Sequence, residues 1–207
     1  RFNYSHDNGS RGIGIQLANK VVVEYNELAF NNRLHYSVGW NSGGIKNSFG
    51  DFCLLRGNYI HDNNCKGIWI DCLANDNIIE GNIFADNSSS GITVEISLRN
   101  KVRNNIFVHN NRLSSYDGSS IYIQSCAFNE AYGNKIEVSK LKGDGINIAL
   151  GDRRQPAIKD PKQEHADCYC HDNKVYDNSV TYLGESGRSG VSTQNPPGWD
   201  SNRFDGN

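Results

Sequence analysis

The chain has 207 residues, 37% of them hydrophobic, so it can bury the core of one elongated domain. Its net charge is −2 and no basic stripe runs along it, which argues against a nucleic-acid partner. No apolar run approaches membrane-spanning length and no signal peptide opens the sequence, so a membrane partner is not expected.

Three phrases recur in a fixed order. The first is a small residue followed by alternating apolar residues, the second is a polar-to-apolar run, and the third is Asn-x-x-x-x-Asn. Successive first phrases are 32, 23, 24, 29, 25 and 45 residues apart, so the shortest steps define the unit and the longer ones contain insertions. In chain order, the strand-bearing segments are 3–8, 12–15, 19–24, 26–31, 44–45, 52–56, 58–63, 67–70, 75–80, 82–87, 91–94, 100–103, 105–110, 120–123, 129–132, 145–148, 172–176 and 190–191.

A unit near 23 residues with three short segments of period 2 predicts three strands per coil. Helical repeats are longer and have a 3.6-residue period, and the spaced leucines of leucine-rich repeats are absent. We therefore expect an all-β fold, a parallel β-helix of about seven coils, in which each strand pairs with its counterparts one coil above and below. Glycines are expected to open the first phrase because the chain turns sharply there.

Asparagines recur at one corner of the predicted coil. Asn31, Asn63, Asn87 and Asn110 are expected to stack as a ladder, with their amides bonded along the stack and their backbone left-handed. Three histidines recur in the same corner segment, and we expect them to be structural: His6, His61 and His109.

Domain organisation follows from the repeat. One solenoid domain is expected over residues 1–207, as a fragment of a longer protein because no polar cap is visible at either end. Insertions at about 32–43, 112–119 and 151–166 all lie beside the first-phrase strand. Loops from the edges of one sheet are predicted to wall a cleft.

The six cysteines leave alternatives open. Buried free thiols are favoured for Cys53, Cys65, Cys72 and Cys126, with a disulfide between inserted loops or metal ligation as alternatives. Cys168 and Cys170 are spaced too tightly for the usual zinc knuckles.

Two carboxylates occupy the same position in consecutive first phrases. Ile68 and Ile70 point into the coil, so Trp69 and Asp71 point out, and Glu95 repeats Asp71 one coil later. Because stacked strands lie about 4.8 Å apart, the carboxyls should be about 5 Å apart. Retaining glycosidases have about 5–5.5 Å and inverting ones about 6.5–9.5 Å. Repulsion between such close acids should split their pKa values, giving a nucleophile and a general acid.

Candidate substrate-binding residues flank this pair. Trp69 or Tyr122 could stack against a sugar face, and Lys46 could bond hydroxyls or keep one carboxylate ionised. Trp40 and His35 lie in the first insertion and are candidate substrate contacts. No organic cofactor is implied. A calcium site built with nearby Asn and Asp oxygens, or a solvated face without a role, are the alternatives. Like charges are normally avoided at stacked positions of a sheet, so the presence of two acids here favours a functional role for them.

Several phrases together resemble one known family. Trp40, Gly43-Gly44-Ile45-Lys46, the segment 55–63, Gly67-Ile68-Trp69-Ile70-Asp71 and Gly91-Ile92-Thr93-Val94-Glu95 resemble the β-helix glycoside hydrolases that include β-xylosidases. The resemblance spans roughly residues 40–100. It implies a right-handed single-stranded parallel β-helix, Asp71 as nucleophile and Glu95 as acid/base. The family's usual Thr before the Asp is Ile70 here.

The function expected from these features is a secreted or periplasmic retaining glycoside hydrolase whose partner is a polysaccharide or oligosaccharide substrate. The first alternative is a polysaccharide lyase acting on uronate-containing glycans, with Lys46, Arg153 and Arg154 as candidate residues. The second is a non-catalytic carbohydrate-binding or adhesin segment. The sugar, the linkage and the oligomeric state stay open.

Overall fold

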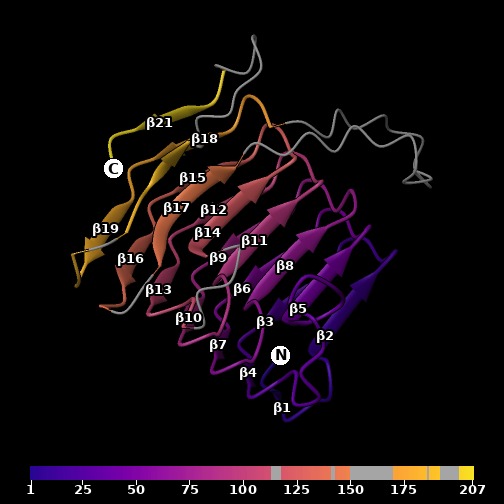
Figure 1. Ribbon diagram of the computed structural model, residues 1–207. Coiled ribbons are helices and arrows are strands. Elements are labelled where there is room, and N and C mark those ends of the chain that lie inside the picture. The colour runs from indigo at the N-terminus through magenta and orange to yellow at the C-terminus, as the bar shows by residue number, and fades with distance from the viewer. Residues whose placement is uncertain (113–117, 141–142, 150–169, 186, 192–200) are drawn as a thin grey trace.

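The computed structural model describes residues 1–112, 118–140, 143–149, 170–185, 187–191 and 201–207. Their strands form three seven-stranded parallel sheets, which we name A, B and C (Figure 1). Sheet A contains β1 (Tyr4–His6), β4 (Glu27–Ala29), β7 (Tyr59–His61), β10 (Ile83–Ala85), β13 (Ile106–Val108), β16 (Lys135–Val138) and β19 (Ser179–Tyr182). Sheet B contains β2 (Arg11–Gln16), β5 (Gly43–Ser48), β8 (Ile68–Asp71), β11 (Ile92–Glu95), β14 (Ser119–Gln124), β17 (Asp144–Ala149) and β20 (Gly190–Val191). Sheet C contains β3 (Val22–Glu24), β6 (Leu54–Arg56), β9 (Ile78–Glu80), β12 (Lys101–Arg103), β15 (Glu130–Tyr132), β18 (Lys174–Tyr176) and β21 (Arg203–Asp205).

The chain visits sheets A, B and C in turn and climbs one coil at each round. Ile68 pairs with Ile45 in the coil before and with Ile92 in the coil after. Every pairing between named strands is parallel and joins successive coils, as in the predicted β-helix of three strands per coil. The two ends of the chain lie at opposite ends of the stack (Figure 1).

A continuous core runs along the inside of the coils. Leu28, Ile60, Phe84 and Phe107 occupy one inward position of sheet A, and all four are fully buried. The rings of Phe84 and Phe107 stack at 4.7 Å between centroids. Burying each such side chain contributes about 1.5–3 kcal/mol, so regular stacking of apolar residues is what holds neighbouring coils together.

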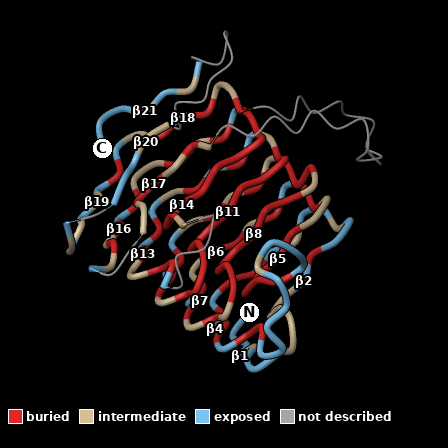
Figure 2. The backbone as a smooth tube through the Cα atoms, viewed as in Figure 1, coloured by how far each residue is buried: buried red, intermediate tan, exposed pale blue. Residues whose placement is uncertain are grey.

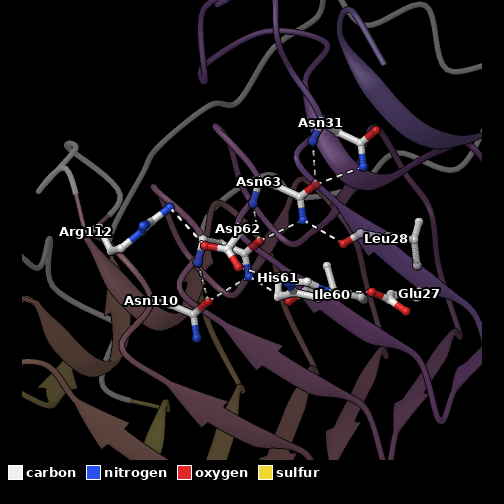
Figure 3. A network of polar contacts seen from close by, with 10 residues as sticks. Glu27, Leu28, Asn31, Ile60, His61, Asp62, Asn63, Asn110 and Arg112 are labelled. Atoms are coloured by element: carbon white, nitrogen blue, oxygen red, sulfur yellow. Dashed lines mark hydrogen bonds and ion pairs between the residues drawn. The ribbon is translucent and has the colours of Figure 1, made fainter. Parts of the chain in front are cut away.

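The predicted asparagine ladder is present, but left-handed backbone is not the reason for it. The side-chain amides of Asn31, Asn63 and Asn87 each donate to Oδ1 of the next Asn, at 2.9, 2.9 and 2.8 Å (Figure 3). The expectation of left-handed backbone at these Asn residues was wrong, because the positive φ falls one residue earlier, as at Asp62. Asn is needed here for its amide, which bonds to both neighbouring coils. Two further ladders run through Asn26, Asn58, Asn82, Asn105, Asn134 and Asn178, and through Asn77, Asn100, Asn129, Asn173 and Asn202.

The glycines that open the sheet B strands also have another cause than the one expected. Gly44, Gly67 and Gly91 do not adopt positive φ, so a sharp turn is not the reason for them. A Cβ at Gly67 would lie 2.4 Å from the carbonyl oxygen of Gly91 and 2.8 Å from Cδ1 of Phe84. Glycine is required because the backbone of the next coil passes too close for a side chain.

The first two predicted insertions lie between sheets A and B. Residues 30–42 connect β4 to β5, and residues 109–118 connect β13 to β14. The insertion at 151–166 lies outside the described residues, as do Arg153 and Arg154. No helix in the described ranges is long and apolar enough to cross a bilayer.

The cysteines that the structure describes are free thiols: Cys53, Cys65, Cys72, Cys126 and Cys170. Cys168 lies outside the described residues. Burial raises the pKa of the Cys65 thiol to about 12. Four of the five are fully or almost fully buried, which agrees with buried free thiols.

Candidate active site

The predicted carboxylate pair lies at the ends of two adjacent strands of sheet B. Asp71 ends β8 and Glu95 ends β11. The residues before them, Ile70 and Val94, are paired across the two strands and point into the core. Because side chains alternate along a strand, Asp71 and Glu95 both lie on the outer face of sheet B, one coil apart.

The outer face of sheet B is buried, unlike the outer face of sheet A. Asp71 is 6% exposed and Glu95 4%, whereas Tyr59 and Ile83 on the outer face of sheet A are 41% and 40% exposed. In Figure 2 the backbone of β8 and β11 is coloured as buried, in agreement with the burial of every residue of these two strands. The outward pair is therefore a covered site and not a freely solvated face.

Both carboxyl oxygens of Asp71 face donors. Nζ of Lys46 lies 3.0 Å from its Oδ2, and the backbone N–H of Cys72 donates to its Oδ1 at 2.7 Å. These two contacts fix the orientation of the Asp71 carboxyl group. The side chains of Lys46 and Asp71 are only 8% and 9% exposed, so little water screens the pair.

Among the described residues, Trp69 and Gln124 donate to Glu95. The indole Nε1 of Trp69 donates to its Oε2 at 3.1 Å, and Nε2 of Gln124 donates to its Oε1 at 2.7 Å. The hydroxyl of Tyr122 in turn donates to Oε1 of Gln124 at 2.9 Å. These bonds fix the orientation of the carboxyl group of Glu95. The described donors to Glu95 are an indole and a side-chain amide, whereas the described donors to Asp71 include the ammonium group of Lys46.

Two lysines lie over Trp69. Nζ of Lys46 is 3.4 Å from the centroid of the indole ring, and Nζ of Lys66 is 4.4 Å from it. Lys66 is fully buried and donates to the carbonyl of Val38 at 2.7 Å, which ties the loop 30–42 to the start of β8. Trp69 is 4% exposed, so its ring is covered on the outer face of sheet B and lies against both ammonium groups.

Three residues of this site were not predicted from the sequence: Gln124, Lys66 and Cys72. Gln124 pairs in register with Glu95, so its column position was a usable signal. Lys66 precedes the Gly67 phrase and gave no signal. Cys72 follows Asp71, and its pKa is raised to about 12 by burial and by the Asp71 carboxylate. It is therefore a neutral thiol at neutral pH and not a nucleophile.

His35 and Trp40 lie in the loop between β4 and β5 and not on the strands of sheet B. Trp40 is 78% exposed, and no described contact joins it to Asp71 or Glu95. His35 lines a separate groove at the corner between sheets A and B. Within the described residues, no cluster of three or more His, Cys, Asp or Glu side chains is placed to hold a metal ion.

Comparisons with known proteins give the fold. The chain is similar to the periplasmic alginate epimerase AlgG, solved as a double mutant, with 15% identity over 98% of this chain and 44% of that one and a TM-score of 0.60. It is also similar to the mannuronan C-5 epimerase AlgE4 A-module of Azotobacter vinelandii, with 14% identity over 93% of this chain and 55% of that one and a TM-score of 0.54. The chain thus spans about half the length of these structures. No curated protein matches it by sequence.

The family model described as "Right handed beta helix region" matches residues 3–159. That match covers most of the chain and agrees with the three parallel sheets and with the resemblance noted in the sequence, although it does not single out the glycoside hydrolases. The chain belongs to the right-handed β-helix region family.

Proposed function

We propose that the chain acts on carbohydrate as a retaining glycoside hydrolase, with Asp71 and Glu95 as its catalytic residues. Asp71 attacks the anomeric carbon and forms a glycosyl ester while the glycosidic C–O bond breaks. Glu95 protonates the departing oxygen. Glu95 then takes a proton from water, which attacks the anomeric carbon and releases Asp71.

The observation that carries the proposal is that two carboxylates lie on adjacent strands of sheet B, on the same buried outer face. Asp71 faces the Lys46 ammonium at 3.0 Å, so its negative charge is compensated and it is suited to be the nucleophile. Among the described groups, Glu95 accepts from Trp69 and Gln124, which fix the orientation of its carboxyl group and suit it to exchange a proton. The retaining mechanism needs two such carboxyl groups, one as nucleophile and one as proton donor.

The other residues have supporting roles in this scheme. Lys46 compensates Asp71, and Tyr122 orients Gln124, which orients Glu95. The predicted sugar contacts of Trp40 and His35 stay predictions. A secreted or periplasmic location is part of the proposal, in keeping with the periplasmic epimerase among the similar structures.

A second candidate is chemistry on uronate units, as in a lyase or a C-5 epimerase. The similar structures are alginate and mannuronan epimerases, and Lys46 is a buried cation on the same face as the pair. In this scheme a cation neutralises the uronate carboxylate while a base removes the C5 proton. A lyase then expels the group at C4, and an epimerase returns a proton to the opposite face.

The test compares the chain with its Asp71→Asn and Glu95→Gln variants on aryl glycosides and on uronate polymers. The hydrolase proposal expects release of the aryl alcohol, reduced by about 100-fold or more in both variants. Glu80→Gln, an acid on the outer face of sheet C that is paired with Arg103, is the matched control and should keep full turnover.

Two results would change the assignment. Unchanged turnover in both variants sinks the mechanism. Unsaturated or inverted uronate products without hydrolysis of neutral glycosides would favour the second candidate, and sugar binding without any product would favour a binding module.

A further inference from the structure

A groove lies at the corner between sheets A and B, away from the carboxylate pair. Its volume is about 480 Å³. We name it the corner groove; it is lined by Asp7, Phe30, Arg33, Asp62, Asn64 and Arg112, and by His35. His35 was predicted from the sequence as a substrate contact, and this groove is where the structure places it.

Two similar His–Asp–Arg sets flank the groove. Nη1 of Arg33 lies 2.6 Å from Oδ1 of Asp7, whose other oxygen lies 2.7 Å from Nδ1 of His6. Nη2 of Arg112 lies 3.6 Å from Oδ1 of Asp62 (Figure 3). The other oxygen of Asp62 lies 2.9 Å from a ring nitrogen of the preceding histidine. Carboxylates and guanidinium groups are thus presented side by side at two levels of the stack.

Phe30 stands between the two sets. His6, Ala29 and His61 are stacked in register in sheet A. The residues after them, Asp7, Phe30 and Asp62, therefore follow one another along the corner, and an aromatic ring replaces the middle carboxylate. Phe30 is 44% exposed and its φ is 55°, an unfavourable backbone region for a bulky side chain. An exposed ring between ion pairs provides an apolar surface inside a polar groove.

Both arginines come from the places where the repeat is interrupted. Arg33 lies at the start of the insertion at 32–43, and Arg112 at the start of the insertion at 112–119. The corner between β10 and β11 has no insertion, because only residues 86–91 connect the two strands, and it contains no arginine. The groove is therefore built by departures from the repeat.

The charges of the groove point to its ligand. Two guanidinium groups stand against two carboxylates, so their formal charges cancel and an anion gains little net attraction. A neutral molecule rich in hydroxyls can donate to the carboxylates, accept from the guanidinium groups, and lay its C–H face on the ring of Phe30. Neutral sugars have this chemistry.

We propose that the corner groove binds neutral glycosyl units, as a sugar-binding site separate from the catalytic pair. The inference rests on the proposed function only in taking carbohydrate as the ligand. It makes the substrate a neutral glycan and not a polyuronate, and it assigns Phe30 as the stacking residue.

The test is calorimetric titration of the full chain carrying Glu95→Gln, which prevents turnover. The probes are neutral xylo- and gluco-oligosaccharides and oligouronates of equal length. The neutral oligosaccharides should bind more tightly, and adding Phe30→Ala or Arg112→Gln should weaken their binding by about fivefold or more. Phe52→Ala is the matched control, because Phe52 is also exposed (58%), also has positive φ (54°) and does not line the groove. It should leave the affinity within about twofold.

Unchanged neutral-sugar affinity in Phe30→Ala, or tighter binding of the oligouronates, would overturn the proposal. Thermal melts establish that each variant is folded, and Arg112→Gln serves in place of Phe30→Ala if the latter unfolds. If only the hydrolase proposal fails, the unsubstituted chain hydrolyses nothing, but the Glu95→Gln chain still binds neutral sugars through the groove. The two proposals can therefore fail independently.

Discussion

Lys46 and Asp71 form a buried ion pair whose value lies in the site more than in the fold. Burying two charges costs solvation energy that their attraction only partly returns. Their side chains are 8% and 9% exposed, so neither can be satisfied by water if the other is removed. A pair of this kind is kept where one charge has to stay in place for a purpose, and here that charge belongs to the proposed nucleophile.

A double-mutant cycle tests this dependence. Lys46→Met should lower the free energy of unfolding by about 3–5 kcal/mol, because it leaves the carboxylate of Asp71 buried without its partner. Urea denaturation of Lys46→Met, Asp71→Asn and the double variant measures the coupling. The double variant should be more stable than the sum of the single effects allows, by about 1.5 kcal/mol or more. Additive losses would contradict the ion pair, and the Asp71→Asn background reports separately on the contact between Lys46 and Trp69.

At the scale of the element, the asparagine ladders join neighbouring coils at the corners, as backbone hydrogen bonds join neighbouring strands in the sheets. Oδ1 of Asn87 accepts from the backbone and side-chain N–H groups of Asn63, and its amide donates to Asn110 and to the carbonyl of Ile60. One side chain therefore serves polar groups on both neighbouring coils. All three ladder residues are fully or nearly fully buried, so no water replaces a lost bond.

Asn87→Ala should accordingly cost about 3 kcal/mol or more, since it leaves several buried polar groups without partners at once. Asn8→Ala is the matched control at the exposed end of the same ladder, where Asn8 donates to Asn31 at 2.8 Å. That change should cost less than about 1 kcal/mol. Chemical denaturation of both variants measures the difference. Equal losses would mean that the ladder acts as a cooperative whole and not bond by bond.

The sequence predicted the elements well and their local causes less well. A period of two within each phrase placed the strands, since one sheet face is apolar in every coil. The left-handed residue was misplaced by one position, because Asn is common both in turns and in ladders, and composition does not separate the two roles. The glycines were misread for a similar reason. The close approach of Gly91 to Gly67 is a contact between coils, and a single phrase contains no trace of it.

At the scale of the whole molecule, the solenoid decides what could be foreseen about the site. Register alone put Asp71 and Glu95 on one face, because stacked coils repeat every position. The burial of that face was not foreseeable, since it depends on long-range contacts such as that between Lys66 and the loop around Val38. Gln124, by contrast, follows from register, because it pairs with Glu95 on the next coil and donates to its carboxylate.

Stability should also be distributed along the stack, because each coil contacts only its neighbours. Inward residues of the middle coils, such as Ile68 and Ile92, are fully buried. Inward residues near the two ends, such as Ile13, Val180 and Phe204, are only partly buried. Amide hydrogen exchange should therefore be slowest in β7 to β13 and faster by about 100-fold or more in β1, β19 and β21.

The strands that hold Asp71 and Glu95 lie in the slow region, so the proposed catalytic pair rests on the most rigid part of the chain. A single uniform protection factor along the stack would contradict this gradient and indicate one cooperative unit. Asn87→Ala separates the two cases further, since it should speed exchange first in the coils next to it and leave the distant ends unchanged.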